Sequence, residues 1–158
     1  PRCVSPLGAV HNRPDVRRAC LPHVGLITNA RSLARHYAAL IGTLPGEPLL
    51  PPERLRMAIA LQTEQPDAIS GSVTRRSLGY ILPGTAGVGA MGSGASAFGH
   101  PGAGGAWGSA DPHQGFAFAL TKTRLTDVGD PWHTADLVAQ ALRGALAIPP
   151  SAASPESP

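Results

Sequence analysis

The residues with the clearest potential for chemistry are His100, Asp111 and His113, which lie close together in the sequence. Imidazole and carboxylate groups are common metal ligands, and a hairpin would bring these side chains near one another. Asp111, however, is followed at once by Pro112 and soon after by Gly115, an order typical of a tight turn. Because the turn uses the Asp111 carboxylate, the sequence predicts no metal site.

A second pattern, Gly87-Val88-Gly89-Ala90-Met91-Gly92, has the glycine spacing of a dinucleotide-binding loop. Such a loop needs a strand before it, a helix directly after it and an acidic residue ~20 residues further on. The residues that follow, Ser93-Gly94-Ala95-Ser96, do not start a helix, and Asp111 near the required distance belongs to the predicted turn. We therefore interpret 84–97 as a flexible loop and expect no cofactor.

The remaining reactive side chains have ordinary explanations. Ser32 and Ser96 have no base placed beside them by the sequence, so both are interpreted as surface or loop residues. Tyr37 lies on an apolar helical stripe and is interpreted as a core residue. Cys3 and Cys20 lack the CxxC spacing of a zinc site; they could form one disulfide, although nothing requires an oxidising compartment.

Composition predicts a thin core and excludes several classes of partner. Leu, Ile, Val and Phe make up 34 of 158 residues, whereas Gly and Pro make up 36. The formal net charge is +3, but the arginines are scattered, with no basic stripe interleaved with aromatic residues, so we expect no nucleic-acid partner. No apolar run approaches the ~18–20 residues of a membrane span. The N-terminal residues lack the apolar core of a signal peptide, which favours the cytoplasm.

Hydrophobic periodicity predicts two helices in the first half of the chain. The first covers 30–42, with Thr28 or Asn29 as its N-cap and Gly42 at its C-terminal end. The second begins at 51–53 and continues to residue 62. Residues 1–27 are punctuated by proline and are predicted to be extended, and 63–76 are predicted to form a loop.

The second half of the chain predicts an antiparallel sheet and a final helix. Strands are expected at 77–82, 97–103, 106–110 and 115–122, with a hairpin turn at 111–115. Phe116, Phe118 and Leu120 alternate with small residues, which predicts one bulky face. The final helix starts near 130–132, where Trp132 is expected to pack it on the sheet. One face of this helix is apolar and consists of Leu137, Val138, Ala141, Leu142 and Leu146.

Two stretches carry a resemblance to a known family. The segment 98–125 contains His100-Pro101-Gly102, then Gly104-Gly105 and Asp111-Pro112. It resembles the third active-site segment of β-lactamase-like serine esterases, a strand with H-x-G followed by paired glycines and a hairpin. The segment 25–42 is similar to the turn and helix that precede this strand in the family. The resemblance implies the C-terminal portion of such an enzyme.

The resemblance also implies roles for three residues. Gly102 would allow the backbone to approach a substrate closely, and the N–H of Ala103 would be a donor of the oxyanion hole. His100 would position the substrate or share in proton transfer. The implied substrate is a small-molecule ester or amide, without metal or cofactor.

Two further motifs of the family are absent from this sequence. The family nucleophile lies in S-x-x-K, where the lysine accepts the serine proton. The only lysine is Lys122, and position 119 is alanine. Neither Tyr37 nor Tyr80 is followed by the residues of the family's tyrosine motif. Smaller departures are Thr121-Lys122-Thr123, where the family often has asparagine, and the bulky Trp107.

The sequence therefore predicts an α+β fold with an antiparallel sheet of about three strands, packed by a C-terminal helix and preceded by a helical segment. This fold is a partial β-lactamase/transpeptidase-like domain at 28–148. An extended segment at 1–27 would precede this domain, and a disordered tail at 149–158 would follow it. We expect a serine hydrolase portion that is inactive alone. The alternative is a non-catalytic relic or an interaction module that requires a complementary N-terminal half. An open sheet edge and an uncovered apolar face would then favour self-association.

Overall fold

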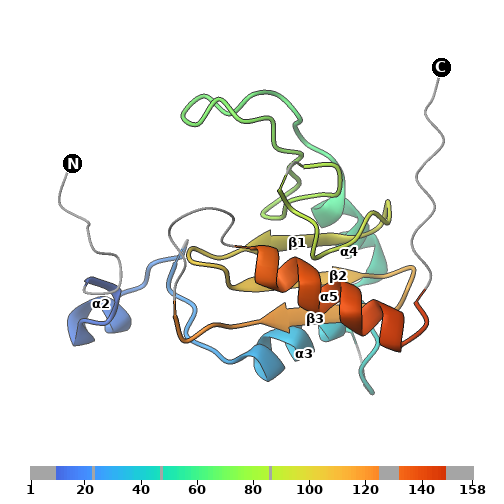
Figure 1. Ribbon diagram of the computed structural model, residues 1–158, viewed down its shortest axis with the longest axis horizontal. Helices are drawn as coiled ribbons and strands as arrows, with labels where there is room; N and C mark the ends of the chain where they lie inside the picture. The colour runs from blue at the N-terminus through green and yellow to red at the C-terminus, as the bar shows by residue number, and fades with distance from the viewer. Residues whose placement is uncertain (1–9, 23, 47, 86, 125–131, 149–158) are drawn as a thin grey trace.

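A three-stranded antiparallel sheet with helices on both faces forms the body of the protein (Figure 1). The computed structural model describes residues 10–22, 24–46, 48–85, 87–124 and 132–148. Its strands are β1 (Phe98–Pro101), β2 (Trp107–Asp111) and β3 (Phe116–Leu120), in the spatial order β1-β2-β3. Its helices are α2 (Pro14–Arg18), α3 (Ala30–Leu40), α4 (Pro52–Ile59) and α5 (His133–Ala145). The predicted α+β class, the three-stranded sheet and the C-terminal helix are confirmed.

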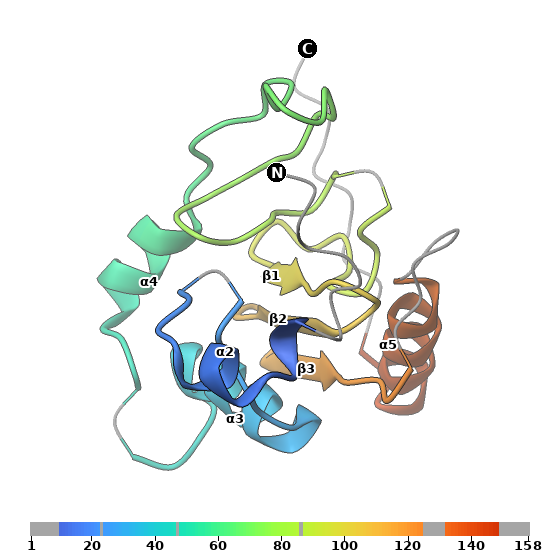
Figure 2. The ribbon, with the colours of Figure 1, turned by 90° about the vertical axis from the view of Figure 1, so that its left-hand side faces the viewer.

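Helices α3 and α5 lie on opposite faces of the sheet (Figure 2). The α3-side cluster consists of the buried residues Tyr37, Leu40, Leu55, Leu82, Phe98 and Ala110. The α5-side cluster consists of the buried residues Ile81, Val88, Ala90, Met91, Ala97, Trp107, Phe116, Phe118, Ala135 and Ala139. Each face of the sheet therefore contributes to a separate hydrophobic cluster.

Helix α3 begins and ends where the sequence predicts. The Asn29 side chain accepts a hydrogen bond of 2.9 Å from the Ser32 N–H, which satisfies one of the free donors of the first turn. Gly42 has φ +70°, a conformation that glycine adopts without steric cost. Tyr37 and Leu40 face the sheet, and a Cβ on Gly108 would lie 2.5 Å from the Tyr37 ring. Glycine at 108 therefore allows α3 to approach β2.

The hairpin between β2 and β3 also follows the prediction. The Asp111 carboxylate accepts hydrogen bonds from the backbone N–H groups of His113, at 3.0 Å, and Gln114, at 3.4 Å. Gly115 ends the turn with φ +60°. The carboxylate is thus used by the turn, as the sequence predicts.

The strand predicted at 77–82 is wrong. Ser77 N–H donates to the Tyr80 carbonyl at 2.9 Å, and Gly79 between them has φ +89°, so a turn interrupts the segment. Only Ile81 reaches the sheet, where it exchanges backbone hydrogen bonds of 2.7 and 3.1 Å with Gly99. The apolar pattern is typical of a strand because Ile81 and Leu82 are buried. The segment makes only isolated bridges and no continuous ladder of hydrogen bonds.

The described residues of the 84–97 segment, which exclude residue 86, form no helix or strand, but several of them pack in the core. Val88, Ala90 and Met91 belong to the α5-side cluster. Arg143 of α5 donates to the carbonyl oxygens of Ala90, at 3.0 Å, and Met91, at 2.7 Å. A Cβ on Gly92 would lie 3.2 Å from the Arg143 guanidinium, so this glycine serves the contact between the loop and α5.

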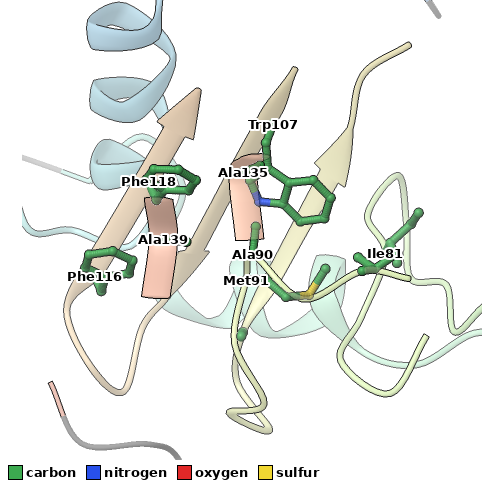
Figure 3. Close-up of a cluster of buried hydrophobic side chains, with 10 residues drawn as sticks. Ile81, Ala90, Met91, Trp107, Phe116, Phe118, Ala135 and Ala139 are labelled. Carbon is green, nitrogen blue, oxygen red and sulfur yellow. The ribbon is translucent and has the colours of Figure 1, made fainter. Parts of the chain in front are cut away.

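The apolar stripe predicted on α5 faces away from the sheet. Ala135 and Ala139 are 0% exposed and lie against the sheet, whereas Leu137 is 53% and Leu146 61% exposed. Figure 3 shows the reason: the large rings of the α5-side cluster already occupy the space above the strands, so only alanine fits beneath the helix. The prediction that Trp132 packs this end of the helix on the sheet is confirmed.

Two further predictions about helices need correction. Helix α2 lies within the segment predicted to be extended, because Pro14 opens a short turn of helix with Asp15 in its first turn. Helix α4 ends at Ile59, earlier than predicted, since Ala60 already has extended geometry. The predicted disordered tail and Cys3 lie outside the described residues. None of the described helices is long and apolar enough to cross a bilayer.

Candidate active-site wall on β1

The three residues singled out by the sequence lie together at the end of β1. His100 is within the strand, and Gly102 and Ala103 begin the connection to β2. Gly102 N–H donates to the Ala106 carbonyl at 2.8 Å, while Gly105 N–H donates to the Gly102 carbonyl at 3.2 Å. These bonds close a tight turn, the 102–105 turn.

The turn requires glycine at several positions for different reasons. Gly104 and Gly105 have φ +76° and +103°, which favour glycine strongly. Gly102 does not have a positive φ, but a Cβ there would lie 3.0 Å from the Cβ of Ala106. Glycine at 102 thus avoids a steric clash inside the hairpin. This structural role is separate from the close approach of a substrate that the sequence suggests.

The N–H of Ala103 points away from the sheet. The Gly99 N–H donates to the Ile81 carbonyl, on the side of β1 away from β2, whereas the Gly102 N–H donates to the Ala106 carbonyl, on the side of β2. The Gly102 carbonyl points into the turn, where it accepts a hydrogen bond from the Gly105 N–H. The C=O and N–H of one trans peptide point in opposite directions, so the Ala103 N–H, which belongs to the same peptide, points out of the turn. Ala103 is exposed, and none of the described residues accepts a hydrogen bond from its N–H. It is an available donor.

His100 lies on the same face of β1 as Phe98, since alternate residues share a face. The side chain is exposed, and its Nδ1 lies 2.7 Å from the Pro101 carbonyl oxygen. A carbonyl only accepts hydrogen bonds, so this contact favours the tautomer with its proton on Nδ1. The lone pair then lies on Nε2, which can accept a proton.

One polar residue of this region was not assigned to the site by the sequence. The indole Nε1 of Trp132 donates a hydrogen bond of 3.1 Å to the Gly102 carbonyl. The available signal was the indole itself, because a partly buried N–H donor nearly always has an acceptor. Its partner is distant in sequence, and only the folded chain shows it.

Ser96 and Asp111 form a structural contact at the other end of the sheet. The Ser96 hydroxyl donates to the Asp111 carboxylate, and Asp111 is only 2% exposed. The same carboxylate oxygen also accepts hydrogen bonds from the backbone N–H groups of the turn, so the contact ties Ser96 to the turn. The described residues contain no group of three or more His, Cys, Asp or Glu side chains that could hold a metal ion.

Tyr37 is confirmed as a core residue. It is 6% exposed and packs against the rings of Phe98 and Tyr80, with centroid distances of 5.8 and 6.3 Å. Burial raises the pKa of the Tyr37 phenol, and the neighbouring Tyr80 adds to this effect. Burial likewise raises the pKa of Tyr80. Both phenols are therefore neutral near neutral pH, as expected for side chains that pack in a core.

The raised pKa predicts that stability falls in alkali. Above the ordinary tyrosine value of 10.0, the unfolded chain ionises at Tyr37 while the folded chain does not. The stabilisation is present below this pH and is lost as the pH rises toward the folded pKa. Replacing Tyr37 by phenylalanine should make the decline shallower, as measured by urea midpoints on both sides of pH 10.0. Equal declines in the two proteins would contradict the prediction.

Comparison with known proteins places the chain in a family. The model of the family described as Beta-lactamase matches residues 3–143. The chain belongs to the β-lactamase family. No curated protein matches it.

Solved structures similar to the chain include three β-lactamase-like proteins. EstA from Arthrobacter nitroguajacolicus Rue61a is 26% identical with a TM-score of 0.64, covering 85% of this chain and 37% of EstA. A penicillin-binding protein homologue from Caulobacter crescentus is 29% identical with a TM-score of 0.61, covering 72% and 31%. A family VIII carboxylesterase is 27% identical with a TM-score of 0.61, covering 72% and 31%. The chain thus spans about a third of their length, and its sheet and helices are a partial β-lactamase/transpeptidase-like fold.

Proposed function

We propose that the chain forms the strand-side wall of a serine hydrolase site that transfers acyl groups from small esters or amides. The observation that supports this is the exposed N–H of Ala103, directed outward beside His100 at the end of β1. The membership of the chain in the β-lactamase family supports the reaction class. In this proposal the chain is the C-terminal portion of the complete enzyme.

The proposed chemistry divides the site between two parts. A serine in S-x-x-K, supplied by a part that this sequence lacks, attacks the substrate carbonyl carbon and passes its proton to the lysine. The negative charge that forms on the carbonyl oxygen is stabilised by the Ala103 N–H and the N–H of the nucleophile. The alcohol or amine leaves with a proton, and water then hydrolyses the acyl-serine.

His100 is placed to act on the substrate in this scheme. Its Nε2 carries the lone pair when the Pro101 carbonyl holds the proton on Nδ1. It can accept a hydrogen bond from the substrate or a proton during turnover. Gly102 contributes by keeping the strand edge free of side chains beside the substrate.

The test compares the chain alone with the complemented chain. The chain alone should hydrolyse neither a chromogenic ester nor a β-lactam, and no serine should react with a fluorophosphonate probe, because S-x-x-K is absent. With the complementary two thirds of a family VIII carboxylesterase, ester hydrolysis should appear, and the probe should label a serine of the complementary part. Labelling of a serine in this chain, or a folded complex without activity, would sink the proposal.

The second candidate is a non-catalytic relic or an interaction module. The exposed stripe of α5 favours it, because Leu137, Leu142 and Leu146 are 53, 41 and 61% exposed. Strand β3 also has one open edge, since β2 is its only partner among the described strands. The nucleotide sequence upstream discriminates the two candidates: an in-frame S-x-x-K indicates an enzyme portion, and an out-of-frame one indicates a relic.

The exposed surface predicts that the chain self-associates in isolation. Exposed apolar residues on a helix and an open strand edge both favour contacts between copies. Leu142→Glu should shift the weight-average mass toward the monomer in sedimentation equilibrium, because a charge on this stripe opposes its burial. Gln140→Glu adds the same charge at an exposed polar position of α5 and is the control. A monomer with a sharp thermal transition in the unmodified chain would contradict the prediction.

The cytoplasm is the compartment that we propose for the chain. Cell fractionation of a tagged chain tests this, and recovery in the envelope fraction would contradict it.

A further inference from the structure

Trp132 is the residue that connects the start of α5 to the 102–105 turn. Its indole Nε1 donates to the Gly102 carbonyl at 3.1 Å, across thirty positions of the sequence. The ring packs against the α5-side cluster, which holds the indole in place. The donor is therefore fixed by hydrophobic packing before any substrate arrives.

The Gly102 carbonyl receives two hydrogen bonds. One comes from the Gly105 N–H within the turn, at 3.2 Å, and the other from Trp132. A carbonyl oxygen has two lone pairs, so both are in use. Two donors in different directions restrict rotation of the peptide plane more than the bond of the turn alone.

The same peptide plane carries the N–H of Ala103. Because the peptide is planar and trans, an anchor on its oxygen also fixes the direction of its N–H. A hydrogen bond to the oxygen also polarises the peptide and strengthens the N–H as a donor. We propose that Trp132 is a positioning residue that aims the Ala103 N–H at the substrate oxygen. This inference rests on the proposed function.

The orientation of the N–H can be measured without activity. In the full chain, the residual dipolar coupling of the Ala103 N–H should change on Trp132→Phe, which keeps an aromatic ring but lacks the donor. Ser109→Ala is the matched control, because it removes the acceptor of the other tryptophan, Trp107, whose Nε1 lies 3.0 Å from the Ser109 hydroxyl. The control should leave the Ala103 coupling unchanged. An unchanged coupling in Trp132→Phe overturns the inference.

A measurement on the unmodified chain does not depend on how the variants fold. A scalar coupling through the hydrogen bond should connect the Trp132 indole nitrogen with the Gly102 carbonyl carbon. Its absence, when couplings across the backbone bonds between β1 and β2 are seen in the same spectrum, would refute the proposed contact.

The kinetic test uses the complemented chain. Trp132→Phe should lower kcat by about 10- to 100-fold with little change in KM, because a misdirected donor weakens transition-state binding most. An unchanged kcat would overturn the inference if Ala103→Pro, which deletes the N–H itself, still impairs hydrolysis. If Ala103→Pro has no effect either, the proposed function fails instead.

Discussion

Ala103→Pro in the complemented chain should lower kcat for ester hydrolysis by about 10²–10³-fold, the loss expected when one oxyanion-hole donor is removed. Proline lacks the backbone N–H but fits the second position of a tight turn, where its fixed φ is favourable. Ala103 occupies that position, because the Gly105 N–H bonds to the Gly102 carbonyl. The substitution therefore removes the donor while the turn is retained. KM should change little, since the charge on the oxygen develops only in the transition state.

Ala103→Ser is the matched control for this prediction. It keeps the N–H and adds a side chain of similar size at an exposed position. Its kcat should remain within a few-fold of the unmodified protein. Equal losses in both variants would show that the side chain at 103, rather than the N–H, affects the reaction. Full activity of Ala103→Pro would exclude Ala103 as an oxyanion donor.

Trp107→Ala should destabilise the chain by about 3–5 kcal/mol, the range for removal of a large buried aromatic residue. Trp107 is 1% exposed and lies in the central strand, where it pairs with Pro101 on one side and Leu120 on the other. Domains of this size are stable by only about 5–15 kcal/mol. The variant should thus lose much of its stability, as measured by its urea unfolding midpoint.

Met57→Ala provides the control for this loss of stability. Met57 is 57% exposed on α4, so its truncation leaves no cavity. The expected change in unfolding free energy is within about 0.5 kcal/mol. A similar loss in both variants would contradict the prediction that burial of Trp107 is what stabilises the chain at this position.

The local elements and the family can be predicted from the sequence. Helix α3 carries its own boundaries, because Asn29 caps it and Gly42 ends it. The hairpin at Asp111 and the alternation in β3 are likewise encoded within a few residues. The resemblance of the segment around His100 to the third active-site segment led to the family, which the match over 3–143 establishes.

What the sequence could not decide depends on contacts between distant residues. A stripe of leucines such as that on α5 is typical of a buried face, yet the rings of Trp107 and Phe118 leave room only for alanine against the sheet. The glycine-rich segment predicted flexibility, yet Arg143 binds its carbonyl groups. A helical period shows which residues share a face, but the volume already filled by other strands decides which face is buried.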